Sequence, residues 1–175
     1  GAFEVKSGIK DPNLNFGLRA SGRFDDKYPA VKVKMNLDIA DLEKLNLHAG
    51  PLKIRGVIDA DIATSNPDFL NGKVFLSNIE VVKEAQPMIL DSIRILAYAD
   101  KERNNIKIQS QFLKAELDGK YKLTTLAATL KKSLSKYMDL QTPKTKGDSD
   151  EQRLTFSVTV ASDPLLFQLL PDLKT

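Results

Sequence analysis

Apolar and polar residues alternate along most of this chain, and this alternation constrains the fold more than any other feature. In the clearest segment, residues 31–39, apolar side chains occupy every odd position and lysine, asparagine or aspartate every even one. Successive side chains of a β-strand point to opposite faces of the sheet, so this period of two predicts strands with one buried and one hydrated face. We therefore expect a protein that is mainly β.

Other segments repeat the pattern and bring the expected number of strands to about nine. A change of phase between Leu76 and Ile79 predicts a β-bulge near Ser77 and Asn78, because one extra residue in a strand shifts the alternation. The clearest strands are expected within residues 14–20, 31–39, 52–62, 74–81, 88–99, 106–112, 113–121 and 154–160.

Two segments depart from the period of two and predict helices. Apolar residues recur at helical spacing over 123–138, where Thr124 or Thr125 can cap the start, and we expect Leu126, Leu130, Leu134 and Tyr137 to pack across the sheet. Asp163 followed by Pro164 is typical of a helix start, and the apolar segment 164–170 is expected to be buried on more than one side. We assign 1–175 to a single β-rich domain in which the polar stretch 141–152 is a mobile insert.

Composition argues against several classes of function. The 26 basic and 23 acidic residues give a net charge of +3 that is spread along the chain, which does not favour a nucleic-acid partner. There is no cysteine and a single histidine, His48, so thiolate chemistry and most imidazole chemistry are excluded. No apolar run is long enough for a membrane-spanning helix. No G-x-S-x-G sequence or glycine-rich phosphate loop occurs, and we expect no enzyme activity and no cofactor.

Two groups of carboxylates are candidate metal ligands. Asp59 and Asp61 share one face of a predicted strand, but Lys53 and Arg55 lie on the same face, which favours hydrated surface charge. The acidic residues within 148–151 lack the spacing and the later bidentate glutamate of a calcium loop. Neither group predicts a metal site.

The apolar face of the predicted strands must be covered or must bind something apolar. Three arrangements meet this requirement: a closed barrel, a two-layer sandwich, or a curled sheet that forms an open trough. The pattern alone leaves all three open.

Several segments carry a resemblance to a known family. The NPDFLNG turn from Asn66 to Gly72, the LDSI segment from Leu90 to Ile93 and the A-x-L-x-G-x-Y-x-L run that begins at Ala115 resemble the TamB family of the AsmA-like superfamily, and its Bacteroidetes-type members in particular. The resemblance covers about residues 12–140 and, more loosely, the last strand and the helix after it. It does not extend to 141–152.

The resemblance implies a curled antiparallel-rich sheet, an open trough or β-taco with an apolar concave face. It also implies that this chain is a fragment of a longer periplasmic protein that is anchored in the inner membrane of a Gram-negative bacterium. Roles proposed for the family are phospholipid transport between membranes and assembly of outer-membrane β-barrel proteins with a barrel partner.

Two hypotheses about function follow, and a closed barrel that binds a small ligand is a lesser third. One hypothesis is β-augmentation, in which free sheet edges pair with strands of outer-membrane β-barrel proteins or of a barrel partner. The leading hypothesis is that phospholipid acyl chains lie in the trough, and the residues expected to line it are Val33, Met35, Leu37, Ile39, Ile54, Ile58, Ile62, Ile93, Ile95, Ile106, Ile108, Leu117 and Tyr121.

Overall fold

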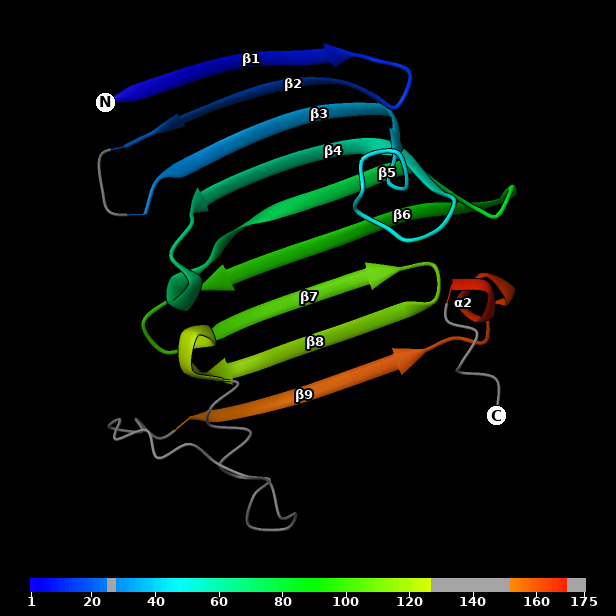
Figure 1. The fold of residues 1–175 in the computed structure, drawn as a ribbon. Coiled ribbons are helices and arrows are strands. Elements are labelled where there is room, and N and C mark those ends of the chain that lie inside the picture. The colour runs from blue at the N-terminus through cyan, green and yellow to red at the C-terminus, as the bar shows by residue number, and fades with distance from the viewer. Residues whose placement is uncertain (25–27, 127–151, 170–175) are drawn as a thin grey trace, which may run out of the picture.

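One antiparallel sheet of nine strands organises the protein (Figure 1). The structure is a computed structural model, and it describes residues 1–24, 28–126 and 152–169. Strand order follows the chain from first to last, and each pair of neighbours is antiparallel. The strands are β1 (Ala2–Lys10), β2 (Leu14–Arg23), β3 (Ala30–Asp41), β4 (Leu52–Thr64), β5 (Asn71–Lys83), β6 (Gln86–Ala99), β7 (Asn104–Ser110), β8 (Leu113–Lys120) and β9 (Arg153–Val160).

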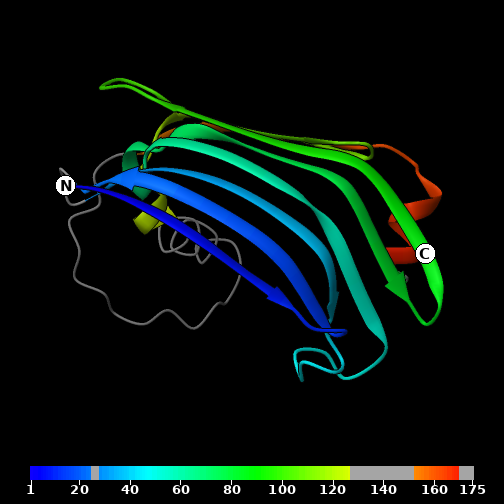
Figure 2. The same ribbon diagram turned by 90° about the horizontal axis from the view of Figure 1, so that it is seen from above.

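The sheet is open, because β1 and β9 form its two edges and do not pair with each other. Figure 2 shows that the strands bend along their length, which gives the sheet one concave and one convex side. The prediction of a mainly β protein with a curled, open sheet is confirmed. Within the described residues there is neither a closed barrel nor a second sheet, so those two alternatives are wrong.

Cross-strand pairing explains why the alternating sequence folds in this way. Met35 lies opposite Leu18 on β2 and Ile58 on β4, and the same row continues through Leu76 on β5 to Ile93 on β6. Residues directly opposite on one face of an antiparallel pair have their side chains in contact range, so each apolar residue is flanked by apolar neighbours. The register thus gathers the apolar residues of successive strands on one face.

The opposite face carries charge in complementary pairs. Lys34 lies 3.4 Å from Asp59, and Lys32 lies 3.3 Å from Asp61, both across the β3–β4 pair. Asp59 and Asp61 are therefore neutralised by lysines of the neighbouring strand, in keeping with the predicted hydrated surface charge.

The predicted bulge in β5 is present. Asn78 has a φ of 51°, and the β4–β5 register shifts between Arg55 and Val57. Asparagine tolerates this left-handed conformation better than most residues, which fits its place at the extra position.

Beside the sheet lie the 3₁₀-helix η1 (Pro67–Phe69) and the helix α2 (Pro164–Leu169). As predicted, Asp163 caps α2, since its carboxylate accepts a hydrogen bond of 2.8 Å from the Leu165 N–H. Leu166 of α2 is buried. Residues 123–126 are helical, whereas the remainder of the helix expected over 123–138, and the insert 141–152 except for Gln152, lie outside the described residues.

Candidate functional site: the apolar concave face

The apolar rows lie on the concave side of the sheet. The helical residues that follow β8 lie on that side in Figure 2, and Leu123 and Leu126 share a cavity with Ile106 and Leu117 of the sheet. The charged pairs of β3 and β4 consequently lie on the convex side. The trough therefore has an apolar floor, and the outer surface of β3 and β4 carries ion pairs.

Most residues predicted to line the trough belong to these rows. Each of them is opposite at least one apolar residue of a neighbouring strand, and each is half-buried. They are Val33, Met35, Leu37, Ile54, Ile58, Ile62, Ile93, Ile95, Ile106, Ile108 and Leu117.

Half-burial is the property that makes this face a candidate site. No large side chain among the described residues is less than 2% exposed, whereas the interior of a two-layer protein normally contains many such side chains. In a single sheet layer, an inward-facing side chain is covered by its own backbone and by neighbouring side chains, and no second layer lies over it. The concave face thus retains apolar surface on which a ligand can be held.

Two of the predicted residues do not share this placement. A register shift in β3 sets Ile39 opposite Asn15, and Ala40 pairs with Leu14 and Ile54 in its place. The extra residue in β3 reverses the alternation, so Ile39 leaves the apolar row.

Tyr121 is the second. It is only 4% exposed, and its hydroxyl donates a hydrogen bond of 3.4 Å to the Leu117 carbonyl oxygen. Burial raises the pKa of this phenol, with a smaller contribution from Asp118. A ligand in the trough would not reach Tyr121 without displacing the residues that cover it.

The end of the trough near Tyr121 is held by contacts between distant segments. The Asp68 carboxylate of η1 accepts hydrogen bonds from the Thr124 N–H at 2.9 Å and from the Thr124 hydroxyl. The Asn104 side chain donates to the Tyr121 carbonyl at 2.6 Å and to that of Asp68. These bonds join η1, β7 and the helical residues after β8, so the helix start occupies a fixed position beside the sheet.

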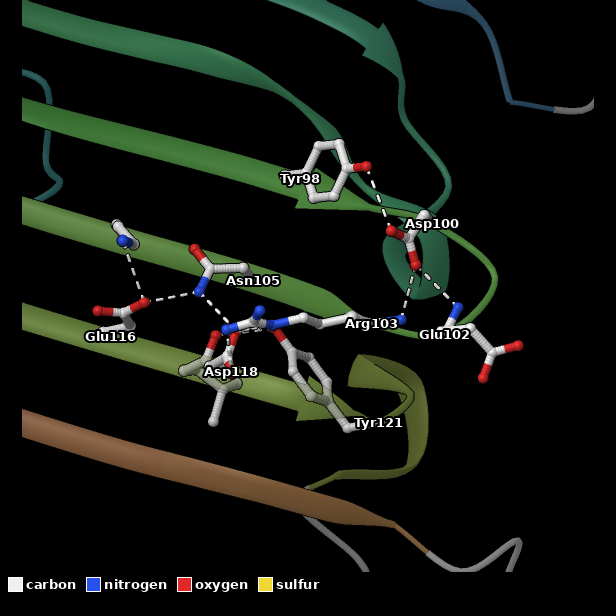
Figure 3. A network of polar contacts seen from close by, with 10 residues as sticks. Tyr98, Asp100, Glu102, Arg103, Asn105, Glu116, Asp118 and Tyr121 are labelled. Atoms are coloured by element: carbon white, nitrogen blue, oxygen red, sulfur yellow. Dashed lines mark hydrogen bonds and ion pairs between the residues drawn. The ribbon is translucent and has the colours of Figure 1, made fainter.

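A polar network supports the same end from the convex side (Figure 3). Arg103 forms a two-pronged ion pair with Asp118, with nitrogen to oxygen distances of 2.6 and 2.8 Å. The Asn105 amide donates to Asp118 and to Glu116, and Lys107 lies 3.2 Å from Glu116. Arg103 and Asn105 lower the pKa of Asp118, and Asn105 and Lys107 lower that of Glu116. This network was not predicted, because it depends on the β7–β8 register.

The opposite end of the trough contains a tight turn after β3. Asp41 is 6% exposed, accepts a hydrogen bond of 3.2 Å from the Lys44 N–H and lies 3.4 Å from the Lys53 ammonium. The Lys44 bond is the main cause that lowers the pKa of Asp41. These contacts fix the turn that follows β3.

A distinct apolar cavity lies on the concave side where the helical residues face β7, β8 and β9. Its volume is about 490 Å³. The residues around it are Ile106, Ile108, Ala115, Glu116, Leu117, Leu123, Leu126, Leu154 and Phe156. By contrast, a larger space of about 740 Å³ beside β1–β4 includes charged residues such as Glu4, Arg23 and Asp61 in its lining.

The two edge strands are the other unusual feature of this surface. Phe156 of β9 is 68% exposed, and Val158 and Val160 are about half exposed. Val5 and Ile9 of β1 are also exposed. Within the described part of the chain, no strand pairs with the outer edge of β1 or β9.

Over the described residues, no helix is long and apolar enough to cross a membrane. In the same residues, no three histidine or acidic side chains come together as a group that could hold a metal ion. Comparisons of the chain with protein-family models, curated protein sequences and solved structures found no match.

Proposed function

We propose that this chain is a segment of a hydrophobic β-groove that carries phospholipid acyl chains between the membranes of a Gram-negative cell envelope. In this proposal the chain belongs to a longer, membrane-anchored protein in the periplasm, and it acts by binding, without catalysis. The observation that carries the proposal is the half-exposed apolar face of a single curled sheet.

The chemistry of this face suits acyl chains. Along the central row, Met35, Ile58 and Leu76 offer only aliphatic groups and a thioether, and the nearest ion pairs lie on the other face. Each methylene group that leaves water for such a surface gains roughly 0.8 kcal/mol, without any need for a directed hydrogen bond. A floor of this kind binds hydrocarbon chains weakly per contact and lets them slide.

A photo-crosslinking experiment with two adjacent positions tests the proposal. A benzophenone amino acid replaces Met35 on the concave face or Lys34 on the convex face of the same strand, and the protein is irradiated in Gram-negative cells. Mass spectrometry of the purified protein should find phospholipid attached at position 35 and little at position 34. Equal labelling at both positions, or none at 35, would contradict the proposal.

The exposed edges favour a second candidate function, β-augmentation with strands of outer-membrane β-barrel proteins or of a barrel partner. From Leu154 to Val160 the edge strand β9 has no charged residue, no proline and no glycine. Charges and proline are the usual devices that prevent an edge from pairing with other strands. Crosslinks from Ser157 to protein, with no lipid at position 35, would favour this function over transport.

A further inference from the structure

The cavity between the helical residues 123–126 and strands β7–β9 differs from the central floor of the trough, because it has walls on two sides. Ile106, Ile108 and Leu117 form its floor, and Leu123 and Leu126 face them from the helix start. The open floor at β2–β5 offers one surface only. A chain in the cavity would therefore contact apolar groups around more of its circumference.

Polar bonds keep this cavity from collapsing. The position of Leu123 and Leu126 is fixed through their neighbour Thr124, which is bonded to Asp68, and through the Tyr121 carbonyl, which is bonded to Asn104. Because these bonds run to η1 and β7 rather than into the floor, the helix start is held beside the floor without filling the space above it.

We infer that this cavity binds one acyl chain of a phospholipid and is the site where the trough retains its cargo. The inference rests on the proposed function and deepens it. The one ionisable residue of the lining, Glu116, has its carboxylate occupied by Asn105 and Lys107, so the cavity offers no charged group to a ligand. A headgroup therefore stays outside, and only an unsubstituted hydrocarbon chain fits the lining.

The cavity is large enough to hold a single chain. At roughly 30 Å³ for a group of the size of a water molecule or a methylene, about 490 Å³ holds on the order of 16 such groups. The ring of Phe156, 68% exposed, stands at the cavity wall and would lose contact with water when the chain enters.

Isothermal titration with 16-carbon lysophosphatidylcholine, kept below its micelle concentration, tests the inference. Ala115→Phe fills the cavity from its floor, and Ala20→Phe adds the same ring to the same face on β2 as a matched control. We expect Ala115→Phe to weaken binding at least tenfold and Ala20→Phe less than twofold. Leu126→Glu, which alters the helix side without touching the sheet, should also weaken binding, and circular dichroism verifies that each variant folds.

A series of chain lengths adds a second readout. Affinity should rise by up to roughly fourfold per methylene and level off near 16 carbons, when the cavity is full. A continued rise to longer chains, or equal effects of Ala115→Phe and Ala20→Phe, would overturn the inference while leaving the proposed function intact. Binding of hexadecanoic acid without the lysophospholipid would overturn the phospholipid assignment. If the wild-type protein binds none of these and gives no lipid crosslink at position 35, the proposed function itself fails.

Discussion

Replacement of Ile58 by glutamate distinguishes an open apolar face from a covered core. Ile58 is half-buried between Met35 and Leu76. Full burial of an isoleucine side chain is worth about 1.5–3 kcal/mol, so removal of a half-buried one should cost roughly 1 kcal/mol. The new carboxylate would remain in water on the open face and add little to this cost.

Met88→Glu is the matched comparison, because Met88 is 3% exposed on the same sheet. A charge placed in a covered position without a partner costs about 3–5 kcal/mol. Urea denaturation followed by circular dichroism measures both variants against the wild type. The expected order is a small loss of unfolding free energy for Ile58→Glu and a loss several times larger for Met88→Glu.

Lipid recovery completes the experiment. Ile58→Glu should fold and yet lose most of the lipid that crosslinks at position 35, because the charge interrupts the apolar floor. If Ile58→Glu destabilises the protein as much as Met88→Glu, the concave face is a sealed interior and the reasoning is wrong. Undiminished lipid recovery from a folded Ile58→Glu would refute the role of this row.

Three further perturbations test the supporting structure. Since Arg103 holds the pKa of Asp118 below its ordinary value, the free energy of unfolding should fall as the pH drops from about 5 toward 3. Urea titrations at each pH should show a flatter dependence for Asp118→Asn than for the wild type. Parallel curves for the two proteins would exclude the ion pair as a cause. Asp68→Ala removes the acceptor for Thr124 and should lower the free energy of unfolding by about 1 kcal/mol. Asp68→Asn keeps an acceptor oxygen and should retain most of that free energy. Equal losses of unfolding free energy in the two variants would argue against capping by Asp68. Gly119 has a φ of 138°, and a Cβ there would meet the backbone of Arg153, so Gly119→Ala should loosen the β8–β9 pair and speed amide exchange in β9 with little effect in β2.

Strand content and the position of the β5 bulge could be predicted from the sequence, because both depend only on local alternation. Strand β1 is not among the strands that the sequence predicts, because Ser7 interrupts its apolar positions and leaves a weaker period of two. Ile39 was assigned to the trough for a similar reason: alternation continues through it in the sequence, and only the pairing with β2 and β4 reveals the extra residue.

Contacts between distant segments could not be predicted in the same way. Asp68 and Thr124 are far apart in the chain, and nothing in either local sequence indicates that one caps the other. Tyr121 continues the alternation of β8, which predicts a groove position, yet it is only 4% exposed. The sequence predicts Thr124 or Thr125 as the residue that caps the helix. In the structure, the N–H and the hydroxyl of Thr124 instead donate hydrogen bonds to the Asp68 carboxylate.

Because strand order follows chain order, every extensive contact in the described residues joins consecutive strands. Such an architecture is nearly one-dimensional: its stability is close to a sum of terms between nearest neighbours, and no strand depends on one far along the sheet. Insertion of one more hairpin would lengthen the trough by about 10 Å, two strand spacings, without repacking the rest. The distance that such a protein spans is therefore set by the number of its hairpins, and evolution can change it by duplication alone.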